Sequence, residues 1–404
     1  EAVEDNKYGV LSLISNAFQN CYLNSSKTNS YFESLLNSSD GDYSRYMYFY
    51  FSNLIENKDI KKAIEVSKRI EPLGDSILLH QIKDWIDNDN FSKFKNHFSC
   101  KNENDILAEI FYLVSNLFST QEIFDQSNFY LKISDYLNPK FYFNQTLLAE
   151  NYYLNKNNYQ AKKILEDLKK KDKLYFWYKT KKIGRILSED ASEDEAIIYI
   201  DEQFNSIKSP TIKILYDYAN INKGFEKYEI AIKYYTELLK KVEKNSYALS
   251  RILYRRGSSY ERIGNYEMAD KDLIESLKAY PDEPYTMNYL AYSWLERNYK
   301  IEEAIVMIES AYKQKENDPY ITDSVGWGYY LIGDYINAEK YLKRALQLMP
   351  DDPIVNDHYG DVLWQLDRKL QAKYYWQAVL ELDDTENEMR SKIKSKLLEG
   401  LEKS

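Results

Sequence analysis

Histidine and cysteine, the residues that most often bind metals or act in catalysis, are few in this chain. His80, His97 and His358 lie far apart, and none stands at the spacing of a metal site. Cys21 and Cys100 form no C-x-x-C pair, which indicates neither a zinc site nor a disulfide framework. No nucleophile elbow, zinc-protease motif or phosphate-binding loop occurs. We therefore expect no catalytic residues, no metal, no cofactor and no enzyme activity.

Two further motifs suggest nucleotide or nucleic-acid chemistry, but each has a simpler structural explanation. Gly326-Trp327-Gly328 resembles part of a dinucleotide loop, yet it lies inside a predicted helix and follows no strand. The run 168–185 mixes lysine with aromatic residues, as single-strand binding surfaces do, but the acidic run 188–195 follows it and cancels its charge. The net charge of −10 also argues against nucleic acid as the main partner.

The elements that must position any binding residues are helices. The 404 residues include only 12 glycines and 8 prolines, and no run alternates convincingly between apolar and polar residues as a strand does. No apolar run approaches the roughly 20 residues that a membrane-spanning helix needs. The 40 tyrosines are explained more simply by a nucleotide-level composition bias than by a functional tyrosine surface. The composition predicts an all-α protein.

Residues 319–350 show how these helices are expected to pair. Gly326 and Ala338 are small and stand 12 positions apart, where two crossing helices need their backbones to approach closely. Gly333 suits the left-handed residue that ends the first helix, and Pro350 cannot continue the second helix. The stretch therefore predicts a helix–turn–helix unit.

The same spacing recurs along the chain and predicts a solenoid. Small residues 12 or 13 positions apart mark eight helix pairs: Ser115 and Ser127, Ala149 and Ala161, Gly184 and Ala196, Ala219 and Ala231, Gly257 and Ala269, Ala291 and Ala304, Gly326 and Ala338, Gly360 and Ala372. The pattern resembles the tetratricopeptide (TPR) repeat, which implies an all-α right-handed superhelix. We expect degenerate repeats over 1–107, eight repeats over 108–384 and a capping helix over 385–404.

A row of polar and aromatic residues is the candidate binding surface. In TPR proteins the first helix of each repeat lines the concave side, where a peptide or protein binds. The fifth, ninth and twelfth positions of three successive first helices hold Asn288, Tyr292, Asp323, Trp327, Tyr330, Asp357, Asp361 and Trp364. Tyrosine and tryptophan combine contact area with a polar group, as binding sites need. The alternative is that the acids brace adjacent helices and the aromatic rings pack between repeats.

Arg256 departs from the repeat pattern. It stands at a position where TPR repeats usually have leucine, and an unpaired charge at a half-buried position is costly. Its partner is expected to be an acid of the protein itself, such as Glu261 or one on the adjacent helix. The alternative is the carboxylate of a bound peptide.

Residues 254–381 carry a further resemblance. The runs LYRRG, YERIGNYEMADKDL, NYLAYSW, DSVGW and NDHYGDVLWQ resemble the C-terminal part of proteobacterial TPR proteins of the cell envelope. Members of this group typically carry a signal peptide or lipid anchor, and some similar lipoproteins recruit a carboxyl-terminal processing protease and its substrates. The resemblance implies a periplasmic adaptor, with an outer-membrane lipid anchor removed ahead of Glu1. A cytoplasmic location is the alternative.

Two functions remain open from the sequence. The first is a non-enzymatic scaffold that binds a protein or peptide in the concave groove and brings a protease or cell-wall enzyme to its substrates. The second is a structural subunit held permanently in a larger assembly, which a large apolar interface would indicate.

Overall fold

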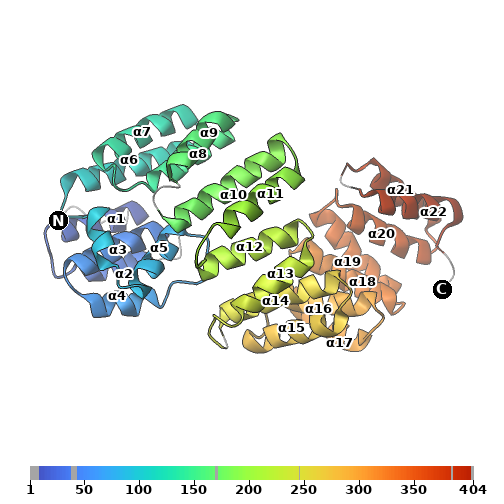
Figure 1. Ribbon diagram of the computed structural model, residues 1–404. Coiled ribbons are helices and arrows are strands. Elements are labelled where there is room, and N and C mark those ends of the chain that lie inside the picture. The colour runs from blue at the N-terminus through green and yellow to red at the C-terminus, as the bar shows by residue number, and fades with distance from the viewer. Residues whose placement is uncertain (1–8, 38–42, 169–171, 245, 384, 402–404) are drawn as a thin grey trace. The chain divides into compact units, whose positions relative to one another are not determined.

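The computed structural model describes residues 9–37, 43–168, 172–244, 246–383 and 385–401 (Figure 1). Over these ranges the chain forms α-helices α1 to α22 and a short 3-10 helix, and it contains no strand. This confirms the predicted all-α class. The chain divides into two compact units, Glu1–Glu226 and Lys227–Ser404. The predicted segments 1–107, 108–384 and 385–404 were defined by the repeat pattern in the sequence. The two units are instead defined by which helices pack against one another.

The first unit holds α1 to α12. Their bounds are α1 (Gly9–Tyr22), α2 (Thr28–Leu36), α3 (Ser44–Glu56), α4 (Ile60–Ser67), α5 (Ile77–Asp87), η2 (Phe91–Asn96), α6 (Glu103–Thr120), α7 (Phe124–Leu137), α8 (Asn144–Leu154), α9 (Asn158–Leu168), α10 (Lys173–Asp190), α11 (Glu193–Asn205) and α12 (Ile212–Gly224). The lysine-rich run at 168–185 spans the start of α10, and its residues 169–171 lie outside the described ranges.

The second unit holds the remaining helices. Their bounds are α13 (Tyr228–Leu238), α14 (Tyr247–Arg262), α15 (Tyr266–Ala279), α16 (Pro284–Glu296), α17 (Ile301–Gln314), α18 (Pro319–Leu331), α19 (Tyr335–Leu348), α20 (Pro353–Gln365), α21 (Lys369–Glu381) and α22 (Asn387–Glu399). Helix α22 lies where the capping helix was predicted.

Small residues stand where the helices of a pair cross, as the spacing predicted. A Cβ atom added to Gly326 of α18 would lie 2.6 Å from Cγ of Leu342 in α19, so a larger residue has no room. Ala338, its partner at the crossing, is fully buried. Gly333 follows α18 with a φ of +79°, a conformation that favours glycine. These three residues explain why 319–350 forms a tight helix pair.

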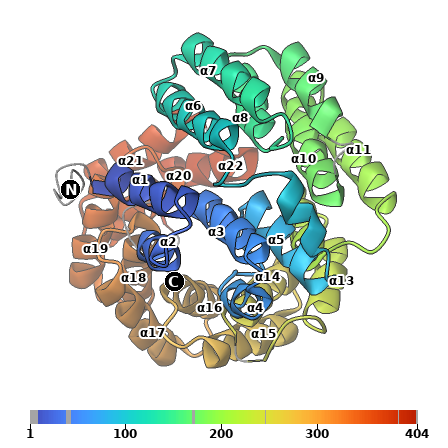
Figure 2. The same ribbon diagram turned by 90° about the vertical axis from the view of Figure 1, so that its left-hand side faces the viewer.

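The first helices of the second unit form its inner side. Each of the helices α14, α16, α18 and α20 contacts the next first helix in this series. Over the described residues, the second helices α15, α17, α19 and α21 make no comparable contacts with one another. In a curved stack of helix pairs, neighbouring elements lie closer together on the concave side. Figure 2 shows α14, α16 and α18 on this inner side. The predicted binding row therefore lies on helices of this inner side.

The start of the chain packs around an aromatic core. The ring of Phe49 in α3 lies 5.5 Å from that of Phe18 in α1 and 4.0 Å from that of Phe98, which precedes α6. Because both segments pack on α3, their neighbouring residues Cys21 and Cys100 meet and form a disulfide, with Cα atoms 5.9 Å apart. The expectation of no disulfide was wrong, since it considered only sequence spacing.

Candidate functional site

The eight predicted binding residues lie on three neighbouring first helices of the second unit. Asn288 and Tyr292 belong to α16; Asp323, Trp327 and Tyr330 to α18; and Asp357, Asp361 and Trp364 to α20. Asp323 and Asp361 are buried, and the other six are half-buried. Since α18 contacts both α16 and α20, the row runs across adjacent helices.

Three aromatic rings are stacked in the centre of the row. The indole of Trp327 lies parallel to the imidazole of His358, with ring centres 4.0 Å apart, and parallel to the phenol of Tyr330, at 4.7 Å. Its Nε1 atom donates a hydrogen bond to Oε1 of Glu296, at 2.7 Å. Stacked rings held by a hydrogen bond keep one orientation, so they offer rigid contact area at low entropy cost.

Asp323 connects two repeats through His358. Nδ1 of His358 lies 2.9 Å from Oδ2 of Asp323, and both side chains are buried. Burial disfavours the charged imidazolium, but the nearby carboxylates of Asp323, Asp357 and Asp361 outweigh it and raise the pKa of His358. Asp323 thus braces α18 against α20, as the alternative interpretation held, and its contact with a ligand stays a prediction.

The far end of the row is covered by α22. Nζ of Lys396 lies 2.6 Å from Oδ1 of Asp357 and 2.8 Å from both carboxylate oxygens of Asp361. Burial and the charge of Asp357 raise the pKa of Asp361 to about 6, although Lys396 opposes the shift. Trp364 packs against Trp376 at 5.3 Å. The acids here brace the capping helix, as the alternative interpretation held.

The α16 end of the row contains a polar atom without a hydrogen-bond partner in the described part of the protein. Oδ1 of Asn288 is buried and accepts no hydrogen bond from the described part of the protein. Tyr292, one turn further along α16, has a raised pKa because of burial and then the charges of Glu296 and Asp323. An acceptor left without a hydrogen bond costs free energy, but this atom is fully covered, so a ligand would reach it only after neighbouring side chains move.

A polar pocket that the sequence analysis missed lies at the start of α14 and α16. Its volume is about 250 Å³. The lining residues are Tyr247, Ser250, Arg251, Tyr254, Arg255, Glu283, Tyr285 and Thr286. Arg251 and Arg255 stand four positions apart, so both guanidinium groups lie on one face of α14. That spacing on a first helix was the available signal, and it was overlooked beside the more unusual Arg256.

Arg256 is a structural residue. Its Nε and Nη2 atoms donate to the two carboxylate oxygens of Asp272 in α15, at 2.6 and 2.8 Å, and its Nη1 atom donates to Thr236 at 2.9 Å. Asp272 is itself buried. The expected acid on an adjacent helix is therefore Asp272, and Glu261 instead accepts a hydrogen bond from Tyr289.

Two kinds of site are absent from the described residues. No group of three histidine, cysteine, aspartate or glutamate side chains is arranged to hold a metal ion. Among the helices in the same ranges, none is both long and apolar enough to cross a membrane.

The His358–Asp323 pair is expected to make the stability of the second unit depend on pH. Because the folded pKa is raised, the stabilisation is complete below about pH 6.5, the ordinary value, and is lost as pH rises through the folded pKa. Urea unfolding between about pH 6.5 and 8.5 should show this loss in the wild type and not in His358→Asn, which does not titrate. If the free energy of unfolding fell with pH equally in both proteins, the result would contradict an ionised His358–Asp323 pair.

Comparison with known proteins supports the repeat assignment. No protein-family model matches the chain. A TPR repeat-containing protein of Pseudomonas aeruginosa is 34% identical over 110 residues, which are 27% of this chain and 18% of that protein. The match thus spans under a fifth of the relative's length.

One solved structure resembles the chain in fold over much of its length. A tetratricopeptide repeat protein from Parabacteroides merdae has a TM-score of 0.51 and 15% identity, and it covers 63% of this chain and 97% of its own. A TPR protein from Thermus thermophilus has a TM-score of 0.41 and 19% identity, over 46% of this chain and 100% of its own.

Proposed function

We propose, from the premise that the chain is a tetratricopeptide repeat solenoid, that it is a non-enzymatic scaffold whose second unit binds a protein or peptide. The binding surface would run along the inner side of α14, α16, α18 and α20. The observation that carries this proposal is the stack of Trp327 with Tyr330 and His358 on the inner side, with the Trp327 indole fixed by its hydrogen bond to Glu296. Rigid, half-buried aromatic area of this kind is typical of a recognition site.

The charges along the row suggest how a bound segment is oriented. Arg251, Arg255 and one acid, Glu283, line the pocket at α14. Glu296 lies on α16, and Asp323 of α18 is paired with His358 of α20. A segment with acidic groups toward α14 and donor groups toward α18 would match this order. We infer that the partner binds in one direction.

The disulfide supports a location in the cell envelope. Disulfides persist in oxidising compartments such as the bacterial periplasm and are rare in the cytosol. A buried Cys21–Cys100 bond therefore favours the periplasm over the cytoplasm. We propose that the scaffold works there as an adaptor for a protease or a cell-wall enzyme, attached to the outer membrane by a lipid anchor.

The test compares partner capture by the wild type and by Trp327→Ala/Tyr330→Ala. Both proteins are used as bait on the envelope fraction of the native organism, and bound proteins are identified by mass spectrometry. Removal of hot-spot aromatic groups weakens the free energy of binding by roughly 2 kcal/mol, so the amount of captured partner should fall more than about tenfold. Helicity measured by circular dichroism should stay nearly unchanged, whereas Gly326→Leu should lower it because overpacking a helix crossing costs roughly 1–3 kcal/mol.

A matched control removes exposed apolar groups from second helices. Tyr374→Ala/Ile336→Ala changes α21 and α19, where both side chains are exposed, and should capture partners like the wild type. Equal capture by all three proteins would move the interface away from the row and favour a permanent structural subunit. Unfolding of the Trp327/Tyr330 variant would show that these rings belong to the core.

A further inference from the structure

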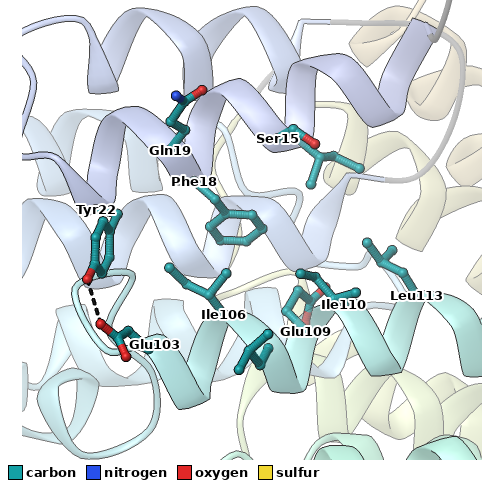
Figure 3. A pocket seen from close by; sticks show the side chains of 11 residues that line it. Ser15, Phe18, Gln19, Tyr22, Glu103, Ile106, Glu109, Ile110 and Leu113 are labelled. Carbon is teal, nitrogen blue, oxygen red and sulfur yellow. Dashed lines mark hydrogen bonds between the residues drawn. The ribbon is translucent and has the colours of Figure 1, made fainter.

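The first unit carries an apolar slot between α1 and α6 that the proposed function does not use. Its volume is about 480 Å³. Ile14 and Phe18 of α1 form one wall, and Ile106, Ile110 and Leu113 of α6 form the other. Figure 3 shows the labelled side chains of both helices converging on the same space.

One end of the slot is held closed by two links between its walls. The hydroxyl of Tyr22, at the end of α1, donates to Oε1 of Glu103, at the start of α6, at 2.7 Å (Figure 3). Next to them, the disulfide joins Cys21 to Cys100. These two links fix the spacing of α1 and the start of α6 at this end of the slot.

The α6 wall leaves large apolar groups in contact with solvent. Leu107 is 45% exposed, Ile110 is 49% exposed and Leu117 is 58% exposed. They stand at intervals of three and seven along the helix, so they form a single stripe. A contiguous apolar stripe that borders an apolar slot marks an interaction surface, whereas scattered apolar residues do not.

The charge of the lining indicates what the occupant must carry. None of the eleven residues that line the slot, all in the described part of the chain, is basic, and two are acidic. The carboxylate of Glu109 is paired with the guanidinium of Arg45. Glu103 has only the neutral hydroxyl of Tyr22 in the slot, so a cation on the occupant would complement it.

Other occupants fit this chemistry poorly. A fatty acid or phospholipid would bring an anionic headgroup to a lining that offers acids and no base. The first eight residues, EAVEDNKY, contain one lysine against three acids, and their apolar side chains are only Ala2, Val3 and Tyr8, so they match the slot poorly. A helix fits the space between two helices, with apolar side chains at intervals of three and four.

We propose that the α1–α6 slot docks an amphipathic helix of a partner protein, with its apolar face in the slot and a lysine or arginine near Glu103. This surface belongs to the first unit and is distinct from the row on α16 to α20. The protein thereby binds one chain through the α1–α6 slot and another through the concave row.

The test uses defined peptides on the full chain. The probe is a fluorescently labelled peptide of about 18 leucine and lysine residues with helical periodicity. Two control peptides are used. The first has the same composition in scrambled order, and the second has glutamate in place of every lysine. Fluorescence anisotropy should show binding of the periodic lysine peptide, and at least about tenfold weaker binding of both controls.

The protein variants locate the site. Ile110→Glu, at a half-exposed position, should weaken binding of the periodic peptide at least about tenfold without unfolding the chain. Ile198→Glu is the matched control, since Ile198 is 57% exposed on α11 of the same unit, and it should bind like the wild type. Trp327→Ala/Tyr330→Ala should also bind this probe normally, which separates the slot from the concave row.

Four outcomes would overturn the proposal. Binding that Ile110→Glu leaves unchanged would exclude the slot, and equal binding of periodic and scrambled peptides would exclude helix recognition. A fluorescent sixteen-carbon fatty acid that binds the wild type but not Ile110→Glu, with no peptide binding, would make the slot an acyl site. A dimer seen by light scattering and lost in Ile110→Glu, again without peptide binding, would make it a contact between two copies.

Discussion

Replacing Arg45 with methionine is expected to destabilise the first unit by about 3–5 kcal/mol, because removal of one member of a buried ion pair leaves the other charge uncompensated. Nε of Arg45 lies 2.8 and 2.9 Å from the two carboxylate oxygens of Glu109, and Nη2 also donates to Asn144 at 2.7 Å. The guanidinium lies 3.5 Å from the centre of the Tyr112 ring. Both charged side chains are buried.

Urea unfolding at neutral pH measures this loss, and a double variant supplies the control. Arg45→Met/Glu109→Leu removes both charges, and apolar replacement of a buried pair is often neutral. The double variant should therefore recover most of the stability that the single variant loses. A single variant as stable as the wild type would show that the carboxylate of Glu109 becomes protonated at little cost, as burial already raises its pKa.

Reduction of the Cys21–Cys100 disulfide is expected to lower the stability of the first unit by about 2–4 kcal/mol. The bond joins residues 79 positions apart and restricts a long loop in the unfolded chain. Urea unfolding with and without dithiothreitol measures the effect. The Cys21→Ser/Cys100→Ser variant should unfold near the reduced wild type and be insensitive to the reductant.

The same bond tests the proposed location. Cells of the native organism are quenched with acid and denatured before alkylation with a maleimide polymer, because both cysteines are buried in the folded chain. Denaturing electrophoresis then reports whether the two thiols are free. We expect no modification before reduction and two modified sites afterwards. Free thiols in the cell would contradict a periplasmic location, while the concave binding row would be unaffected by that result.

Short-range sequence pattern predicted the helix pairs well because their determinants are local. Gly326 and Ala338 stand 12 positions apart in one helix–turn–helix, so their spacing alone shows where two helices must cross. The same local rule placed Trp327 and Tyr330 together on α18, between the predicted residues of α16 and those of α20. The polar partners were harder to predict, because Asp323 is paired with a histidine of the next repeat rather than with a residue of its own.

The sequence by itself determined that this protein is a stack of helix pairs and where the turns between the helices fall. Through the resemblance to TPR repeats, it also predicted which helices form the inner side. Only the tertiary structure decided that Cys21 meets Cys100, that Arg45 pairs with Glu109 and that Lys396 covers the end of the row. The physical reason is distance along the chain. A helix pair is specified by spacing within some 34 residues, whereas these contacts join residues 79, 64 and 39 positions apart, and their geometry depends on how whole repeats stack.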